Sequence, residues 1–255
     1  MRFSVIGVGR AGSSIIRSLC EAGWEFTGCV SREPSYADQA VKKYGGIREE
    51  KPEKILESDI IFITTPDREI KNAVPETSSI LAHMSGFLSS SILGENSFSI
   101  HPVLPLSPFT SLHERFFTLE GKRVDIAKKV VETLKGRYMV ISPDEKPLYH
   151  LACVVASNHV LSILYLSSKL MEGRIPEEEI INLAIETLKK AEKEGIVQAL
   201  TGPVERGEKE VIEKELEKAK EKGYFNPVKE LFKLNLEVAE RKGKDVLPLY
   251  TLLKD

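Results

Sequence analysis

The sequence of 255 residues has few cysteines, few side-chain amides and no excess of charge of either sign. Its three cysteines (Cys20, Cys29 and Cys153) are widely spaced and form no CxxC pair, which argues against a disulfide framework and against a metal site. Lysine and arginine total 36 against 38 aspartate and glutamate residues, so no basic surface predicts binding to nucleic acid. No apolar run approaches the roughly 18 residues that span a membrane. Because the N-terminus does not resemble a signal peptide either, we expect a soluble, cytoplasmic globular protein.

The amide content is low beside that of lysine and glutamate. The chain has 24 Lys and 31 Glu, but only 6 Asn and 2 Gln. This bias is typical of proteins from thermophiles. Long solvated helices would produce the same bias, and composition does not separate the two interpretations.

Short apolar runs alternate with helical stretches over the first part of the chain. Each run is rich in Ile, Val or Phe and is bounded by Gly, Pro, Ser or Asp, which is typical of strands buried on both faces of a parallel sheet. The runs are Phe3–Ile6, Phe26–Val30, Ile60–Thr64, Ile80–Met84, Phe98–Ile100 and Met139–Ile141. The helical stretches include Ala11–Cys20, Tyr36–Tyr44 and Asp125–Lys135. This alternation predicts a doubly wound α/β sheet.

The pattern changes near Ser142–Pro147, after which no convincing strand remains. The later segments read as helices: Leu148–Leu170, Pro176–Lys193, Glu205–Lys222 and Pro227–Lys242. We therefore predict two domains, an α/β domain over residues 1–143 and an all-α domain over residues 144–255.

A glycine motif follows the first strand. Gly7, Gly9 and Gly12 form G-x-G-x-x-G between a strand and a helix, which is the context that dinucleotide binding requires. Gly7 allows the tight turn, Gly9 lets the backbone approach a pyrophosphate, and Gly12 lets the helix pack close to the strand. A glycine turn without a ligand is the alternative. The predicted phosphate-binding residues are Gly7, Val8, Gly9, Arg10, Ala11 and Gly12.

The end of the second strand predicts which dinucleotide binds. In NAD-binding proteins an acidic residue at this position binds the ribose hydroxyls. Here Ser31 and Arg32 occupy it, and a hydroxyl with a guanidinium suits the 2′-phosphate of NADP. Glu33 follows one position later, and an ordinary loop arginine is the alternative for Arg32. Further along, Thr64, Thr65 and Pro66 are expected at the carboxyl edge of the sheet, where the cofactor lies.

Four polar patches interrupt the apolar pattern, and each is a candidate for a site. They are His83–Gly86, Ile100–Val103, the segment from Tyr149 to His159, and Leu200–Gly207. In the third patch His150 and Asn158 lie near one face of a helix. Polar residues on an otherwise apolar helix need partners or a function.

At these residues the sequence resembles the DUF2520 family, whose members have a Rossmann-like domain and a C-terminal helical domain. The motifs are Tyr149-His150-x-Ala152 followed by Ala156-Ser157-Asn158, and the segment Leu200–Gly207. The family is similar to pyrroline-5-carboxylate reductase, ketopantoate reductase and 6-phosphogluconate dehydrogenase-like enzymes.

The resemblance implies an N-terminal Rossmann doubly wound sheet with an all-α C-terminal domain of the 6-phosphogluconate dehydrogenase-like type. It also implies NAD(P) dependence, a homodimer, and a small-molecule substrate held between the domains. In the hydroxyacid enzymes of the wider group, a lysine followed by an asparagine supports proton transfer. The matching face here carries His150 and Asn158 and no obvious lysine.

These residues lead to two hypotheses. In the first, the protein is an NADP-dependent oxidoreductase that reduces a small carbonyl or imine compound, with a carboxylate. His150 is the proton donor, Asn158 orients a carbonyl or holds His150, and His101 approaches the same cleft. Ser85, Gly86 and Arg206 bind the substrate. Each of these residues also has a purely structural interpretation. In the second hypothesis the protein is a non-catalytic dinucleotide sensor, which the missing lysine favours.

Overall fold

The computed structural model describes residues 1–55 and 57–253. Their contacts divide the chain into two compact units, Met1–Ser157 (unit 1) and Asn158–Asp255 (unit 2). The boundary predicted at residue 143 lies just before helix α5 (Lys146–Leu170), whereas the two units meet inside that helix. The first part of α5 therefore belongs with the sheet of unit 1.

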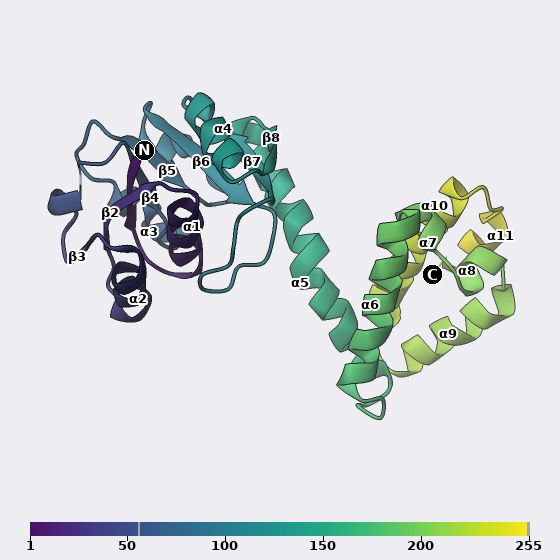
Figure 1. Cartoon of the computed structure of the whole chain (residues 1–255). Helices are drawn as coiled ribbons and strands as arrows, with labels where there is room; N and C mark the ends of the chain where they lie inside the picture. The colour runs from purple at the N-terminus through teal and green to yellow at the C-terminus, as the bar shows by residue number, and fades with distance from the viewer. Residues whose placement is uncertain (56, 254–255) are drawn as a thin grey trace. The chain divides into compact units, whose positions relative to one another are not determined.

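Unit 1 is built on one eight-stranded sheet (Figure 1). Its strands are β1 (Arg2–Ile6), β2 (Glu25–Val30), β3 (Ile47–Glu49), β4 (Ile60–Ile63), β5 (Ile80–His83), β6 (Ser97–Pro102), β7 (Phe116–Glu120) and β8 (Arg137–Val140). Their order is β3-β2-β1-β4-β5-β6-β7-β8. The first six strands are parallel, β7 is antiparallel to β6, and β8 is parallel to β7. The predicted α/β class is therefore confirmed.

The sheet differs from the prediction in three places. The short edge strand β3 was not predicted, because Ile47 is exposed and the two following residues are charged. Strand β7 was also missed, since Thr118 and Glu120 interrupt its apolar character although both are buried. Strand β8 was predicted to be buried on both faces, but all its residues are exposed at the other edge of the sheet.

Alternating residues of the central strands build two apolar layers. Along β4, Ile60 and Phe62 pack in one cluster, together with residues of the helices of unit 1. Ile61 and Ile63 pack in a second cluster with Ile6. All four residues of β4 are fully buried, which explains why this strand reads as a continuous apolar run.

The helices of unit 1 connect these strands. They are α1 (Arg10–Glu21), α2 (Pro34–Tyr44), α3 (Asp67–Ile70) and α4 (Val124–Thr133), with short 3-10 turns at Pro52–Ile55, Lys71–Ala73, Ser90–Leu93 and Pro143–Glu145. Three serines of α1 (Ser13, Ser14 and Ser18) are fully buried, which the sequence did not predict.

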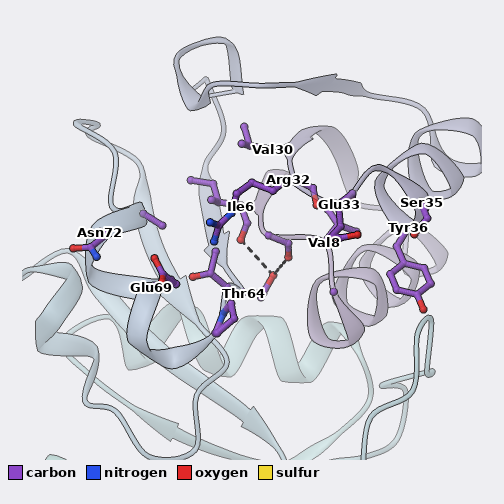
Figure 2. Close-up of a pocket in the computed structure, with 16 residues that line it drawn as sticks. Ile6, Val8, Val30, Arg32, Glu33, Ser35, Tyr36, Thr64, Glu69 and Asn72 are labelled. Atoms are coloured by element: carbon purple, nitrogen blue, oxygen red, sulfur yellow. Dashed lines mark hydrogen bonds between the residues drawn. The ribbon is translucent and has the colours of Figure 1, made fainter.

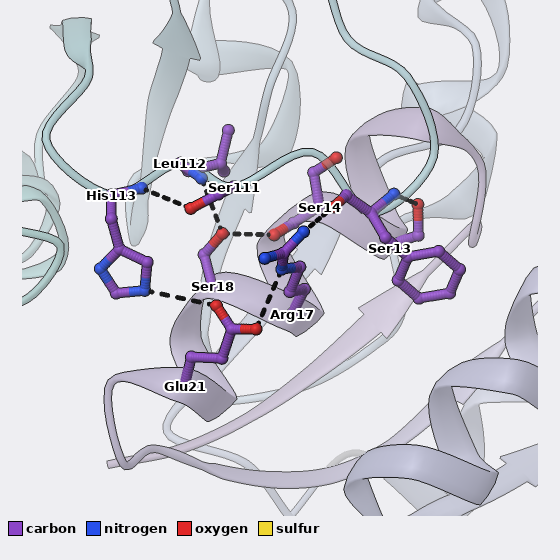
Figure 3. Close-up of polar contacts among 9 residues, drawn as sticks. Ser13, Ser14, Arg17, Ser18, Glu21, Ser111, Leu112 and His113 are labelled. Carbon is purple, nitrogen blue, oxygen red and sulfur yellow. Dashed lines mark hydrogen bonds and ion pairs between the residues drawn. The ribbon is translucent and has the colours of Figure 1, made fainter.

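The buried serines of α1 hold the connection between β6 and β7, residues 103–115 (Figure 3). Ser13 Oγ accepts a hydrogen bond from the Phe109 amide at 3.0 Å, and Ser18 Oγ accepts one from the Leu112 amide at 2.9 Å. Arg17 donates to the Phe109 carbonyl at 2.7 Å. These bonds satisfy backbone groups of the connection that no strand pairs.

Unit 2 is all-α, as predicted. Its helices are α6 (Glu177–Glu194), α7 (Ile196–Ala199), α8 (Pro203–Arg206), α9 (Lys209–Glu221), α10 (Phe225–Arg241) and α11 (Leu247–Tyr250), followed by a 3-10 turn at Thr251–Leu253. Its core comprises Val204, Ile212, Leu216, Leu236, Ala239, Val246, Leu249 and Leu253. The single helix predicted over Glu205–Lys222 is divided into α8 and α9, because Gly207 adopts a left-handed conformation (φ +69°) that ends α8.

The segment Pro143–Leu170, which contains α5, is long and apolar enough to cross a membrane by length and composition, with a mean hydropathy of 1.5 in its most apolar window. The prediction that no apolar run approaches this length is therefore wrong. One such helix is weak evidence for a membrane protein, because the buried core helices of soluble proteins meet the same criterion, although none of this window is buried within the structure.

Candidate functional site

The turn between β1 and α1 requires its glycines for different reasons. Gly7 has a φ of +91°, and a Cβ there would lie 2.8 Å from the Thr65 amide nitrogen. A Cβ on Gly12 would lie 2.3 Å from the Gly7 carbonyl oxygen, so only glycine lets α1 approach the turn. A Cβ on Gly9 would meet no protein atom within 4 Å. The space above Gly9 is therefore open to a ligand.

The N-terminus of α1 faces this open space without a protein cap. Gly9 is the N-cap residue, no side chain in the described part of the chain caps the helix by a hydrogen bond, and the first turn contains no acidic residue. The first amides of a helix carry unsatisfied N–H groups and a partial positive charge. Such a helix start binds phosphate groups.

A cavity of about 770 Å³ lies against this turn (Figure 2). Among the residues predicted to bind the cofactor, eight line it: Gly7, Val8, Gly9, Ser31, Arg32, Thr64, Thr65 and Pro66. Arg10, Ala11 and Gly12 lie in the first turn of α1 and are not part of its lining. The other lining residues are Ile6, Val30, Glu33, Ser35, Tyr36, Glu69, Asn72 and Ala73. The volume is of the size that ligand and cofactor pockets occupy.

The loop after β2 contributes a positively charged side chain, Arg32, to this cavity. Arg32 is exposed and forms no hydrogen bond or ion pair with another residue in the described part of the chain. Ser31 Oγ donates to the Glu33 carbonyl at 2.9 Å, which shapes the loop that carries Arg32. Glu33 and Glu69 also line the cavity, and Glu33 directly follows the arginine. An open glycine turn beside an unpaired guanidinium fits a dinucleotide that carries an additional phosphate.

A second group of polar residues lies at the ends of β5 and β6 and at the start of α5. We call it the polar cluster, and it consists of Asp67, Ser85, Gly86, His101, Lys146, Tyr149 and His150. A capping box starts the helical segment that leads into α5. The amide and the hydroxyl of Ser142 donate to Glu145 Oε2 at 2.7 and 2.9 Å, and Pro143 follows the cap. This start fixes where Lys146, Tyr149 and His150 enter the cluster.

Lys146 is the buried cation of the polar cluster. Its Nζ donates to the Ser85 carbonyl at 3.0 Å and to Ser99 Oγ at 2.6 Å, and its side chain is almost fully buried. Burial lowers the pKa of Lys146 to about 8, although the carboxylates of Glu120 and Asp67 oppose this effect. At pH 7 the group is therefore still mostly a cation.

Ser85 organises the loop after β5. Its Oγ donates to Asp67 Oδ2 at 2.7 Å and accepts from the amides of Phe87 and Leu88 at 3.1 and 3.0 Å. One hydroxyl donor and both acceptor positions are thus occupied. Asp67 directly follows Pro66 of the cavity wall. The serine therefore ties the polar cluster to the edge of the cavity.

His101 and His150 lie against Gly86, and Tyr149 is bonded to His101. His101 Nδ1 and Tyr149 Oη form a hydrogen bond of 2.6 Å. A Cβ on Gly86 would lie 2.9 Å from Cδ2 of His150 and 3.0 Å from Nε2 of His101. Burial lowers the pKa of His101 to about 4, with smaller contributions from Lys146 and His150. His101 is thus neutral at pH 7.

His83, the histidine beside this group, is structural. It is fully buried, and its Nδ1 accepts the Ser85 amide at 3.2 Å. Burial, and then the charge of Lys146, lower the pKa of His83 to about 3.

The other predicted site residues lie in unit 2. Asn158 is its first residue. Arg206 forms a two-pronged ion pair with Glu208, at 2.7 Å from Nε and 2.8 Å from Nη2. The structure thus brings Ser85, Gly86, His101 and His150 together within unit 1.

Lys146 is the residue that the sequence analysis missed, and the expectation that no lysine accompanies His150 is wrong. Lys146 precedes His150 by one helical turn, at a spacing of four residues, and is the first residue of α5. The capping box at Ser142 could have revealed it, because this motif moves the helix start ahead of the predicted Leu148.

Comparison with known proteins gives matches over both halves of the chain. Residues 2–85 match the family described as "NADP oxidoreductase coenzyme F420-dependent", and residues 115–236 match the "Domain of unknown function (DUF2520)". A search of curated proteins finds no match. The NADP prediction is confirmed at the level of the first family.

Solved structures extend these matches over nearly the whole chain. Protein TM1727 from Thermotoga maritima is 30% identical, with a TM-score of 0.78, over 95% of this chain and 100% of that chain. A putative NADP oxidoreductase from Bacteroides fragilis is 17% identical, with a TM-score of 0.70, over 94% of this chain and 98% of that one. An imine reductase from Streptomyces aurantiacus is 16% identical, with a TM-score of 0.64, over 96% of this chain and 100% of that one. The last two likenesses show the fold, a Rossmann sheet with an all-α C-terminal domain. The chain belongs to the DUF2520 family, with an N-terminal region of the NADP oxidoreductase type.

Proposed function

We propose that the protein is an NADP-dependent oxidoreductase that reduces a small carbonyl or imine compound with a carboxylate. The observation that carries this proposal is the position of the cavity beside the polar cluster, both within unit 1. Strands β4 and β5 are neighbours, with Ile63 paired to His83. The segments that follow them, Thr64–Pro66 of the cavity and Ser85–Gly86 of the cluster, therefore leave the sheet side by side.

The chain's own residues would hold the cofactor at defined places. The α1 amides and the open face of Gly9 would receive the pyrophosphate, and Ser31 with Arg32 would bind the 2′-phosphate. When bound, NADPH supplies the hydride donor for a reduction. Pro66 and Thr65, in the cavity wall next to Asp67, would limit access of water from the side of the cluster.

The polar cluster would supply the proton and the charge. His150, which is only partly buried, is the proposed proton donor. Lys146, a buried cation, would favour a negatively charged substrate. Among the structural relatives are a reductive aminase from Aspergillus terreus and the imine reductases, which supports a carbonyl or imine as the reducible group.

The sensor hypothesis rested on a missing lysine. Because Lys146 is present in the polar cluster, that support is gone. The sensor remains as one outcome of the experiment below.

The experiment measures binding and turnover separately. Calorimetry with NADPH and NADH compares the natural chain with Arg32→Ala and with a matched control, Arg174→Ala in unit 2. We expect Arg32→Ala to weaken NADPH binding at least tenfold, which corresponds to about 1.4 kcal/mol, and to leave NADH binding unchanged. Equal losses for both cofactors would contradict the role of Arg32.

Turnover is then tested with NADPH and a panel of small keto acids and imines. We expect oxidation of NADPH with at least one compound, and a loss of at least a hundredfold in His150→Ala. Tight NADPH binding without turnover on the whole panel would favour the sensor. The homodimer and the cytoplasmic location remain predictions, and sedimentation analysis of the full chain tests the first.

A further inference from the structure

Part of the cavity beside the glycine turn is not explained by the binding of phosphate groups. Its lining includes three apolar residues, Ile6, Val30 and Ala73, and two polar ones, Glu69 and Asn72. The three apolar residues pack in one cluster, and we call them the apolar wall. This part of the cavity therefore offers a ligand an apolar surface with polar groups beside it.

Glu69 and Asn72 approach the cavity from the same side. They are three residues apart in the helical segment after β4, with Glu69 in α3 and Asn72 in the 3-10 turn Lys71–Ala73. Such spacing places two side chains on one face, and in Figure 2 both lie on the side of the cavity away from Tyr36.

Both polar groups are available to a ligand. The Asn72 side chain forms no hydrogen bond within the described part of the chain and is exposed. The Glu69 carboxylate forms an ion pair at 3.6 Å with Arg68, whose side chain is 85% exposed. A pair so open to water contributes little, so Glu69 remains free to accept a hydrogen bond from a ligand.

The order of the strands indicates which part of a dinucleotide reaches the apolar wall. Neighbouring strands follow one another as β2-β1-β4-β5-β6, the polar cluster lies at the ends of β5 and β6, and Arg32 follows β2. A nicotinamide beside the polar cluster leaves the adenosine half over β1 and β2. In NADP the base is bonded to the ribose carbon next to the one that carries the 2′-phosphate. A phosphate at Arg32 therefore brings the adenine ring to the apolar wall, which contains Val30.

The chemistry of adenine matches these groups. The ring has apolar faces and an edge on which a donor amino group lies beside an acceptor nitrogen. A carboxylate only accepts hydrogen bonds, whereas a carboxamide can also donate them. We propose that Glu69 and Asn72 select the adenine base of the cofactor. Glu69 accepts from the exocyclic amino group, Asn72 donates to the ring nitrogen beside it, and a face of the ring packs against the apolar wall.

These roles rest on the proposed function, because they require that NADP is the cofactor. They add a selection that the phosphates cannot provide. Hypoxanthine carries an oxygen in place of the amino group of adenine. That oxygen would face the Glu69 carboxylate, and two acceptors without a hydrogen between them repel each other.

Calorimetry with the full chain compares NADPH with reduced nicotinamide hypoxanthine dinucleotide phosphate, which differs from it only at this group of the base. We expect the natural chain to bind the hypoxanthine compound about tenfold more weakly. In Glu69→Gln the new amide can donate to the oxygen, so the two affinities should agree within about twofold. The control Glu76→Gln makes the same change of charge at an exposed residue outside the cavity lining and should keep the tenfold difference.

The role of Asn72 is tested with NADPH alone. We expect Asn72→Ala to weaken its binding about fivefold, because one hydrogen bond is lost. The control Lys71→Ala, at the exposed neighbour that does not line the cavity, should leave it unchanged. Unchanged binding in Asn72→Ala overturns the role of Asn72.

Three outcomes separate this selection from the proposed function. Equal binding of both compounds by the natural chain overturns the selection of adenine and leaves the proposed function standing. Equal losses for both compounds in Glu69→Gln overturn the role of Glu69, since that result places the carboxylate on a part of the cofactor that the two compounds share. No binding of NADPH to the natural chain overturns the proposed function and the selection with it.

Discussion

The cavity beside the glycine turn and the polar cluster lie side by side but are built in different ways. The cavity is formed by a tight turn, a helix start and strand ends that lie within short stretches of the chain. The cluster is made from side chains of α3, α5, β6 and the loop after β5, and its central atom is the Nζ of a buried lysine. The glycine turn of the cavity depends on the absence of side chains. The polar cluster depends on hydrogen bonds between side chains.

The sharpest test of this contrast is a methyl group at two glycines of the turn. In Gly12→Ala the Cβ meets the Gly7 carbonyl oxygen at 2.3 Å, so the turn must move. We expect NADPH binding to fall by about a thousandfold, which corresponds to about 4 kcal/mol. In Gly9→Ala the methyl meets no protein atom. There we expect unchanged thermal stability and only about a tenfold loss of binding, measured by calorimetry. Equal stability of the two variants would contradict the assignment.

Lowering the pH should reduce the stability of unit 1 through His83 and His101, which lie in or beside the polar cluster, and not through the glycine turn. His83 and His101 have folded-state pKa values of about 3 and about 4, below the value of about 6.5 for free histidine. The unfolded chain therefore binds protons first as the pH falls below 6.5. We expect the free energy of unfolding of unit 1 to decrease by about 1.4 kcal/mol per pH unit for each histidine, until the pH approaches 4.

Denaturant titration from pH 7 to pH 5, followed by the fluorescence of Trp24, measures this loss. Trp24 is the only tryptophan and packs against Phe3 in the core of unit 1. In His83→Gln the slope should decrease, whereas the control His113→Gln should keep it. A slope that is the same in all three chains would show that the histidines are not the cause.

Removal of the Lys146 cation should lower the free energy of unfolding by less than acidification does. It should also change the pKa of His101. Lys146→Met leaves the Ser85 carbonyl and Ser99 Oγ without their donor, which should cost about 2 kcal/mol. The pKa of His101 should rise from about 4 toward its ordinary value, because the nearby positive charge is lost. Histidine NMR titration measures the second effect, and the exposed Lys129→Met is the control. A His101 pKa that stays near 4 would mean that burial alone sets it.

The smallest effect concerns the hydrogen bonds between α1 and the β6–β7 connection, residues 103–115. Ser18→Ala removes the acceptor of the buried Leu112 amide and should lower the free energy of unfolding by about 1 kcal/mol. Because Ser18 lies more than two turns beyond the α1 N-terminus, NADPH affinity should change less than twofold. Ser91→Ala, at an exposed serine, is the control. A larger loss of affinity would show that the connection over α1 also shapes the cavity.

The same contrast explains what the sequence could predict. The sheet, the glycine turn and the position of Arg32 follow from local spacing, because each depends on residues that are close in the chain. The role of Lys146 depends on Ser85 and Ser99, which are 61 and 47 residues away. Its position before a proline resembles an ordinary helix start. Strands β3 and β7 were missed because polar residues interrupt the apolar pattern that predicts a strand. The division between α8 and α9 was missed because the charge pattern continues across Gly207.

The serines of α1 also constrain the order in which the chain folds. The bonds from Ser13, Arg17 and Ser18 reach residues that lie 92–96 positions later in the sequence. Helix α1 therefore makes all of these bonds only once residues 109–112 are in place. Such contacts raise the contact order of unit 1, and rates of folding decrease as contact order rises. During synthesis, the first glycine turn to leave the ribosome must wait for nearly half of the chain before its helix is fully anchored.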